Sequence, residues 1–491
     1  MTGLSQPRIT LRNITRVFGS HRANDDISLE IERGSIHAFL GGNGAGKTTL
    51  MKMLQGLEQP DSGEILFDGA SVSLGSPQDA FRHGVGMVQQ EFSIIPQLTL
   101  LDNLILGAEP RGRWGQIDRQ KALHDAERLA VLAGVSIDWS LQAGDTPLHV
   151  RQIVEILRGL YRGSDILILD EPSAVLPREQ VQNLLSLMCS LRDRGHTLIF
   201  ISHKLDEVLA VSDRISILRE GRHVATLPRE GATHDLLIRH MTGEAPRPAP
   251  RPCEKIGSPV LEVDALSIRD PRGVMRVRDA SLRLCEGEIL GIGGLPDAGQ
   301  IELLECLAGL RLQERGRILL KNQPIERSTP HTRRTVGLGY LSADRATESL
   351  CLQASLQDNA IAGRHNVMPF SRWQMLRPAS ISAHVHALLD RFGVRRSDDL
   401  LAAGHLSGGN QQRLAMAREL DAGPCVLLVA QPTRGVDLAG IHVIHSLLVK
   451  FAEEGGAVIL ISEEEAELQT LSTRRLTLHD GILVPEAELA A

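Results

Sequence analysis

Residues 37 to 50 read HAFLGGNGAGKTTL, an apolar strand pattern that runs into a glycine-rich turn. Within this stretch, Gly41 to Thr48 has the spacing of a phosphate-binding loop. Its glycines let the backbone wrap closely round a polyphosphate, with N–H groups pointing inward. Lys47 would reach the β- and γ-phosphates, and the Thr48 hydroxyl would hold Mg²⁺. Because residues 36–40 predict a strand and residues 50–54 predict a helix, the context favours a phosphate site at a helix start.

The composition bounds the class of protein. At 491 residues, the chain is long enough for two or three domains, and its net charge of −7 argues against general nucleic-acid binding. The six cysteines show no metal-binding spacing, so we expect small apolar core residues in a reducing compartment. No signal peptide and no apolar run of membrane-spanning length are visible. The sequence therefore predicts a cytoplasmic protein that reaches a membrane only through partners.

The chain contains an internal duplication. Gly34 and Gly41 recur as Gly287 and Gly294, both 253 residues later (287−34 and 294−41). The segment LDEPSAVLP at 169–177 corresponds to VAQPTRGVD at 429–437, an offset of 260 (429−169). These matches indicate that the chain consists of two halves with the same order of segments. The predicted organisation is a first domain at 1–242, a proline-rich linker at 243–259 and a second domain at 260–491.

Each half alternates apolar strand patterns with helical patterns, which predicts an α/β fold with a largely parallel sheet. The expected strands are 165–169, 197–201 and 214–218 in the first half, and 426–429, 457–461 and 475–478 in the second. Amphipathic patterns at 119–133 and 380–392 predict a helical subdomain in each half.

Asp170 and Glu171 end an apolar strand, where paired carboxylates seldom occur without a nearby cation. With a phosphate loop upstream, Asp170 fits as the acid supporting Mg²⁺ through water, and Glu171 fits as the base that orients the attacking water. The alternative is an exposed strand end carrying two solvated acids.

Three weaker signals lie elsewhere in the sequence. Gln90 ends a short apolar run and could reach metal or water, although a lone glutamine is more often a surface residue. His203 follows the strand after the acidic pair, at the sheet edge where α/β folds bind ligands, but it could equally be structural. The segment LSGGNQQ at 406–412 precedes a helical pattern, so Ser407 is either part of an anion site or an ordinary N-cap.

Taken together and in this order, these motifs resemble the ATP-binding cassette family over nearly the whole chain. The resemblance implies two tandem cassettes, each with a RecA-like P-loop α/β core, an antiparallel β subdomain and an α-helical signature subdomain. It implies ATP and Mg²⁺ as ligands, and it implies that each ATP lies between one half's phosphate loop and the other half's signature loop.

The resemblance also implies roles for particular residues. Catalysis would fall to Glu171, His203 and Gln90, and Mg²⁺ would be held, partly through water, by Thr48, Gln90 and Asp170. Phe18 would stack on adenine. The nucleotide contacts would be Phe18, Gly41, Gly42, Asn43, Gly44, Ala45, Gly46, Lys47, Thr48, Thr49, Asp170, Ser407, Gly408, Gly409 and Asn410.

The second half has lost the groups that the first retains. Lys47 and Thr48 become Gln300 and Ile301, and the acidic pair becomes Ala430-Gln431. Further losses are Gln90 to Ala343 and His203 to Glu463, while the first half has TPLHV at 146–150 in place of a signature. The losses fall on one of the two composite sites. We therefore expect one hydrolytic site per chain.

The degenerate second loop, ILGIGGLPDAGQIEL, is similar to that of ATPases serving bacterial nucleoside and monosaccharide importers. Segments 430–437 and 369–371 resemble the nucleoside branch more closely, with a monosaccharide or sugar-like signal as the alternative. The group implies two transmembrane permease subunits, an extracytoplasmic solute-binding protein, and pairing of the two halves or of two copies of the chain. It implies a peripheral position at the cytoplasmic side of the cell membrane, without nucleic acid.

Two rival classes remain at this stage. Soluble cassette proteins that act on ribosomes or DNA resemble this chain in having twin cassettes, but they usually keep two competent sites and a long charged linker. A regulatory protein that binds ATP without turnover would not need Glu171 or His203.

Overall fold

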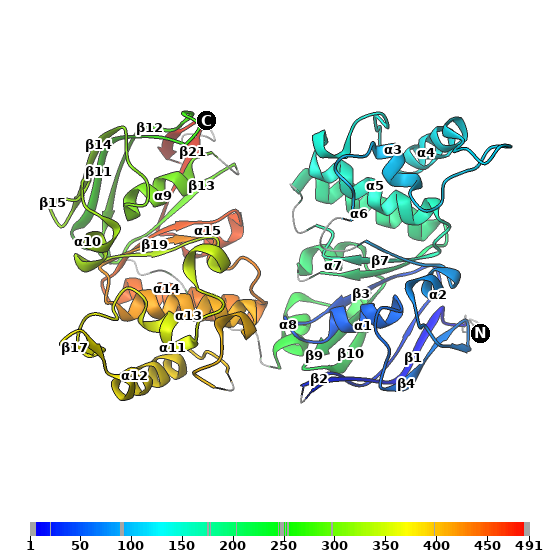
Figure 1. Cartoon of the computed structure of the whole chain (residues 1–491), viewed down its shortest axis with the longest axis horizontal. Coiled ribbons are helices and arrows are strands. Elements are labelled where there is room, and N and C mark those ends of the chain that lie inside the picture. The colour runs from blue at the N-terminus through cyan, green and yellow to red at the C-terminus, as the bar shows by residue number, and fades with distance from the viewer. Residues whose placement is uncertain are drawn as a thin grey trace. The chain divides into compact units, whose positions relative to one another are not determined.

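The computed structural model of the chain is shown in Figure 1. It describes residues 6–19, 21–88, 93–173, 176, 178–202, 204–243, 245, 250, 252, 255–295, 298–396 and 398–485. The chain separates into two compact units, Met1–Pro246 and Arg247–Ala491.

The first unit contains two sheets. A four-stranded antiparallel sheet has the order β2-β1-β4-β5, and a six-stranded sheet has the order β10-β9-β3-β8-β7-β6. In the larger sheet only the β9–β10 pair is antiparallel. The strands are β1 Ile9–Phe18, β2 His21–Ile31, β3 Ile36–Leu40, β4 Ser62–Phe67, β5 Ala70–Val72, β6 Val85–Val88, β7 Ile166–Asp170, β8 Thr197–Ile201, β9 Arg214–Arg219 and β10 Arg222–Pro228.

Helices cover these sheets and build a separate subdomain. In Figure 1, α3, α4 and α5 gather at one end of the first unit, opposite the antiparallel sheet. They have their own apolar core, in which the small side chains of α4 at Ala122, Ala126 and Ala130 are buried. The helices are α1 Lys47–Leu54, α2 Pro77–Arg82, α3 Leu100–Ile105, α4 Arg119–Ala133, α5 Leu148–Tyr161, α6 Arg178–Asp193, α7 Leu205–Val211 and α8 His234–Thr242.

The second unit repeats this plan. Its larger sheet has the order β16-β19-β20-β13-β21-β22, which matches the first unit's order when that is read from the other edge, β6-β7-β8-β3-β9-β10. Its antiparallel sheet has the order β12-β11-β14-β15. The strands are β11 Pro259–Arg269, β12 Met275–Cys285, β13 Ile289–Gly294, β14 Arg315–Leu320, β15 Gln323–Pro324, β16 Leu338–Leu341, β17 Ser371–Arg372, β18 Met375–Leu376, β19 Val426–Ala430, β20 Ala457–Ile461, β21 Arg474–His479 and β22 Ile482–Pro485. The helices are α9 Gln300–Ala308, α10 Pro330–Thr335, α11 Leu356–Ile361, α12 Pro378–Arg391, α13 Gly408–Asp421, α14 Leu438–Glu453 and α15 Glu465–Leu471.

These elements confirm the predicted α/β class and most of the predicted elements. The strand at 197–201 and the helix at 119–133 have the bounds that the patterns indicate, while α12 begins two residues before 380. Between α8 and β11, the described residues form neither helix nor strand.

The expectation for the cysteines is only partly met. Among the described ones, Cys306 is buried, and burial raises the pKa of its thiol to about 11. Cys351 is exposed, so the prediction of a core position is wrong there. The reason is its position in the loop between β16 and α11. There the backbone N–H of Cys351 donates to Asn359 Oδ1 at 2.9 Å. Cys253 lies outside the described residues.

Candidate nucleotide site

The phosphate loop connects β3 to α1, as predicted. Lys47 is the first residue of α1 and is only 8% exposed. Its Nζ donates to the carbonyl oxygens of Gly41 at 2.7 Å and Gly42 at 3.0 Å. The lysine therefore lies across its own loop, with its charge held where a polyphosphate wrapped by that loop would meet it.

Two of the glycines are required by close backbone approach. A Cβ on Gly41 would lie 2.3 Å from the carbonyl oxygen of Leu218, and a Cβ on Gly46 would lie 2.3 Å from that of Ala23. Gly46 also has φ of 96°, a left-handed conformation that side chains disfavour. Any larger residue at these two positions would push the loop away from the sheet.

A buried asparagine that sequence reasoning missed fixes the loop from outside. Asn24 on β2 is fully buried, and its Nδ2 donates to the carbonyl oxygen of Gly46 at 3.1 Å. The sequence feature that could have identified Asn24 is a polar residue at a strand position whose neighbours in the pattern face the core. In the rest of the phosphate loop and the start of α1, Ala45 is buried, Thr49 is half-buried, and Asn43, Gly44 and Thr48 are exposed. The outer surface of the loop is therefore accessible to a ligand.

The acidic pair ends β7. Asp170 is buried, and burial, reinforced by the neighbouring Glu171 and opposed by Lys47, raises the pKa of its carboxyl group. A buried carboxylate with a raised pKa lacks enough cationic compensation, which fits a position beside a divalent cation. The Thr48 hydroxyl and the Asp170 carboxylate are hard oxygen donors of the kind that Mg²⁺ prefers. The first unit's residues thus fit an ATP–Mg²⁺ complex.

Glu171 has an unusual backbone. Its φ is 47°, and its N–H donates to the carbonyl oxygen of Ile201 at 2.9 Å. Gln431 in the second unit has φ of 49° and donates to Ile461 at 2.8 Å. The strained turn is thus a property of the position and was kept when the acid became an amide.

The second unit's loop has the same shape without the charge. Gln300 begins α9, and its Nε2 donates to the carbonyl oxygen of Leu295 at 3.1 Å. A Cβ on Gly299 would lie 2.4 Å from the carbonyl oxygen of Arg276, as for Gly46 in the first unit. Ala430 is buried, and Gln431 Oε1 accepts from the N–H of Glu463 at 3.1 Å. Cation, metal ligand and acids are all replaced, so this loop does not fit Mg²⁺.

The signature segment begins α13. Ser407 is at the N-cap position but makes no side-chain cap, and its Oγ accepts from Asn410 Nδ2 at 3.1 Å. In the first unit the corresponding helix, α5, starts after Pro147, which also provides no side-chain cap. His149 lines a cavity of about 360 Å³ between α4, α5 and α6.

Arg345 connects three segments of the second unit, and sequence reasoning did not identify it. Its Nη1 donates to the carbonyl oxygen of Arg434 at 2.6 Å. A Cβ on Gly408 would lie 2.5 Å from its Nη2, so the guanidinium group packs directly on the start of the signature. Burial and the neighbouring Arg434 lower the pKa of Arg345.

The remaining predicted residues are placed as follows. Phe18 ends β1, is 44% exposed, and has the Arg16 guanidinium 4.7 Å above its ring centre. Gly409 is half-buried on α13. Gln90 and His203 lie outside the described residues.

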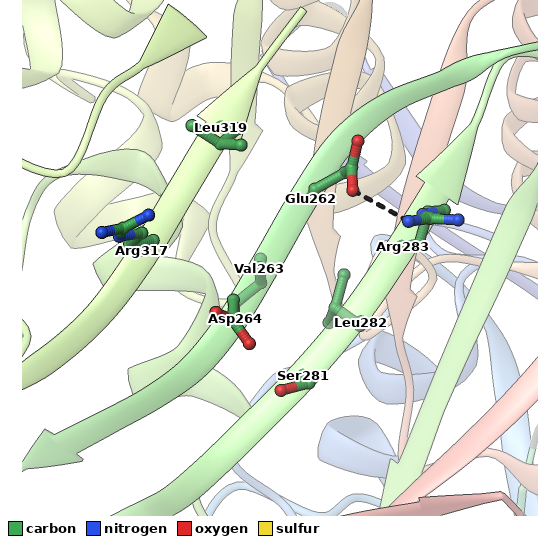
Figure 2. A pocket seen from close by; sticks show the side chains of 8 residues that line it. All are labelled: Glu262, Val263, Asp264, Ser281, Leu282, Arg283, Arg317 and Leu319. Atoms are coloured by element: carbon green, nitrogen blue, oxygen red, sulfur yellow. Dashed lines mark hydrogen bonds and ion pairs between the residues drawn. The ribbon is translucent and has the colours of Figure 1, made fainter. Parts of the chain in front are cut away.

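Other features do not form a competing site. Figure 2 shows a concave patch on β11, β12 and β14 that includes the Glu262–Arg283 ion pair, and it contains no residue of the phosphate loops. Within the described ranges, no cluster of three acidic, histidine or cysteine side chains is arranged to bind a metal. Nor is any described helix both long and apolar enough to span a bilayer. Duplicated α/β units with a phosphate loop define the class as a tandem P-loop nucleotide-binding protein.

Comparison with known proteins identifies the family. The profile of the family described as "ABC transporter" matches residues 24–174 and 277–434. The guanosine import ATP-binding protein NupO of Bacillus subtilis is 37% identical over 477 residues, covering 97% of this chain and 93% of its own. The nucleoside import ATP-binding protein NupA of Lactococcus lactis is 37% identical over 478 residues, covering 96% and 94%. The ribose import ATP-binding protein RbsA 2 of Burkholderia ambifaria is 38% identical over 477 residues, covering 96% and 93%.

The chain belongs to the ABC transporter family, and it is an ATPase of that family. The family resemblance, the fold class and the enzyme class expected from the sequence are thereby confirmed.

Proposed function

We propose that the chain hydrolyses ATP at the first unit's phosphate loop to energise import of a small polar solute, with nucleosides as the first candidate. The observation that carries the proposal is the loop at Gly41 to Thr48, in which Gly41 and Gly46 leave no room for a Cβ and Lys47 lies across the loop. Its counterpart at Gln300 has the same backbone constraints but lacks the charge.

In this proposal each side chain has a defined task. Lys47 binds the β- and γ-phosphates, and Mg²⁺, held by Thr48, Asp170 and Gln90, neutralises charge on the phosphates. Glu171 orients the attacking water and takes its proton, His203 contacts the γ-phosphate, and Phe18 stacks on adenine.

The signature completes the proposed nucleotide contacts. Ser407 to Asn410 start a helix of 14 residues, α13, whose N-terminal N–H groups favour an anion. We propose that these groups act on the ATP of a first-unit loop, from this chain or from a second copy.

The proposed partners are two transmembrane permease subunits and an extracytoplasmic solute-binding protein, with this chain peripheral at the cytoplasmic side of the membrane. The full-length likeness to import ATP-binding proteins supports these partners. The same likeness disfavours a ribosome- or DNA-directed cassette protein.

A second candidate solute has support of its own. The ribose import relative is 38% identical, against 37% for each nucleoside or guanosine relative. Identity therefore does not separate a nucleoside from a monosaccharide, and the preference for nucleosides rests on segments 369–371 and 430–437.

The test is transport by the reconstituted complex. Proteoliposomes holding this chain and its permeases would receive the solute-binding protein loaded with guanosine, uridine or ribose. We expect uptake of the nucleosides with ATP, and none when Glu171→Gln replaces the wild-type chain. Uptake of ribose alone would establish the second candidate, and undiminished uptake with Glu171→Gln would refute the catalytic assignment.

A further inference from the structure

Two of the chain's three tryptophans are almost fully exposed at the tips of short hairpins. Trp114 in the first unit is 91% exposed and Trp373 in the second is 83% exposed, whereas Trp139 is 5% exposed. Each exposed tryptophan directly follows an arginine and precedes the long helix of its helical subdomain, α4 or α12. Each unit therefore exposes one indole ring at a hairpin just before the long helix of its helical subdomain.

Backbone hydrogen bonds close both tips. The first tip, residues 110–117, is closed by an antiparallel bridge between Arg111 and Ile117 and by the Gly112 N–H, which donates to Gln116 O at 2.8 Å. Trp114 lies at its apex. The backbone thus holds the indole outward.

The second tip, residues 367–377, is also a hairpin but has a tighter turn, because Arg372 pairs directly with Met375. Strands β17 and β18 pair, and Phe370 at the base is buried in the core of the helical subdomain. The turn is made by Trp373 and Gln374, with φ of 54° and 62°. Positive φ at both central residues is what a two-residue hairpin turn between Arg372 and Met375 requires, so the turn fixes Trp373 at the tip.

The two tips also share a positive charge. The residues 110–117 and 367–377 contain two arginines each and no acid, although the chain has 60 acidic residues and a net charge of −7. The four arginines are exposed and form no ion pair with any other described residue; they are Arg111, Arg113, Arg372 and Arg377. Of the acids that flank the first tip, Glu109 accepts from the Gly107 N–H at 2.8 Å and Asp118 from the Lys121 N–H at 3.0 Å.

Apolar side chains extend the second tip. Met368, Met375 and Leu376 are 62%, 70% and 54% exposed, and Ile117 on the first tip is 44% exposed. The two tips therefore share an arginine, an indole and exposed apolar surface, while their shapes and other residues differ. A binding site on a partner protein requires a particular shape, whereas a lipid surface adapts to different shapes. Tips with the same amphipathic chemistry but different shapes therefore favour a lipid surface.

In contrast to the sequence-based expectation that the chain reaches a membrane only through partners, we propose that each tip contacts a membrane surface directly, with the tryptophan in the headgroup layer and the arginines on anionic lipid phosphates. Indole rings favour the polar–apolar boundary of a bilayer, and basic residues beside it are attracted to anionic lipids. The inference rests on the proposed function only in placing the chain beside a membrane, and its test needs no ATP turnover.

The experiment measures binding of the full-length chain to vesicles. Phosphatidylcholine vesicles with and without 30% phosphatidylglycerol (roughly the anionic content needed for a surface potential of tens of millivolts) would be compared by cosedimentation and tryptophan emission. We expect binding and a blue shift only with phosphatidylglycerol, both weakened by salt. Since Trp139 is buried, the shift reports the two tips.

Variants separate the tips from the rest of the surface. Trp114→Ala with Trp373→Ala should weaken binding on the order of tenfold through lost apolar contact. Arg113→Gln with Arg372→Gln should weaken it about 25-fold, or about fivefold per arginine, while keeping the indoles. Leu312→Ala is the matched control, because Leu312 is 82% exposed but lies outside both tips, and it should bind as wild type.

Three results would overturn the proposal. The first is wild-type protein that binds neither kind of vesicle, and the second is equal binding to neutral and anionic vesicles. The third is a blue shift that requires permease protein in the vesicles, which would make the tips a protein interface. Vesicle binding is measured without ATP, so retained turnover in Glu171→Gln would refute the proposed function and leave the vesicle result standing.

Discussion

Lys47 and Gln300 close the phosphate loops of their respective units in the same way. Lys47 Nζ donates to the carbonyl oxygen of Gly42 at 3.0 Å, and Gln300 Nε2 donates to that of Leu295, 253 residues later, at 3.1 Å. Both side chains are buried. Glutamine thus preserves the lysine's hydrogen bond within the loop but not its charge, so the second loop keeps its shape without its attraction for phosphate.

The two residues should respond differently to truncation. Lys47→Ala removes a charged hydrogen-bond donor and should weaken ATP binding by about 1.5–3 kcal/mol, with loss of turnover. Gln300→Ala should leave turnover nearly unchanged. Titration of the purified chain with a fluorescent ATP analogue, with steady-state ATPase assays, checks both. A comparable collapse of turnover in Gln300→Ala would refute the assignment of a non-productive second loop.

Restoring the lost residues should restore binding but not hydrolysis. In a Lys47→Ala background, Gln300→Lys with Ile301→Thr should raise affinity for ATP by about tenfold or more, since a charged donor returns. Ala430 and Gln431 still supply no carboxylate, so no ATP should be cleaved. Gln300→Met is the matched neutral control, and equal affinity in the two variants would show that charge is not what the loop lacks.

Arg345 should affect turnover more than ATP affinity. Its bond to the Arg434 carbonyl and its packing on Gly408 hold the signature start in place. Arg345→Ala should lower kcat about tenfold, the value of one charged hydrogen bond, with KM for ATP changed little. Arg434→Ala removes a neighbouring cation but keeps the carbonyl, so it should behave as wild type. A large rise in KM in both variants would instead indicate direct contact with phosphate.

His37 makes the first unit sensitive to acid. It is fully buried on β3, its Nε2 shares a 2.8 Å hydrogen bond with Ser216 Oγ, and burial lowers its pKa to about 3. The unfolded chain protonates this histidine near pH 6.5 and the folded chain does not, so the free energy of unfolding falls as pH drops from 6.5 towards 3. The slope from this one group is about 1.4 kcal/mol per pH unit.

The second unit supplies the control for this prediction, since Leu290 stands where the first unit has His37 (290−37 = 253). His37→Leu should reduce the acid dependence of the first unit by that slope. Urea unfolding at pH 7, 6 and 5 measures it. An unchanged pH profile in the variant would mean that other groups cause the acid sensitivity.

Features set by local pattern were predictable from the sequence. The phosphate loop, the strands on either side of it and the duplication follow from short-range spacing and apolar runs. Features set by long-range contacts were not. Asn24 and Arg345 act on residues 22 and 63 or more positions away, and nothing in their neighbouring sequence marks the partner.

Local pattern also left competing outcomes open. Ser407 has the sequence of an N-cap, yet it makes no side-chain cap, and its hydroxyl accepts from the Asn410 side chain. The exposed tryptophans are a second feature that local sequence pattern does not predict. Sequence reasoning did not single out Trp114 or Trp373, whose indole rings the hairpins expose, while Trp139 is buried.

The central claim is one productive phosphate site per chain, and nucleotide trapping with vanadate tests it most directly. The transporter complex would be incubated with Mg²⁺, ATP and vanadate, and the trapped ADP counted against the amount of this chain. We predict one nucleotide per chain, lost in Lys47→Ala and kept in Gln300→Ala. Two trapped nucleotides per chain, or trapping that survives Lys47→Ala, would contradict the account.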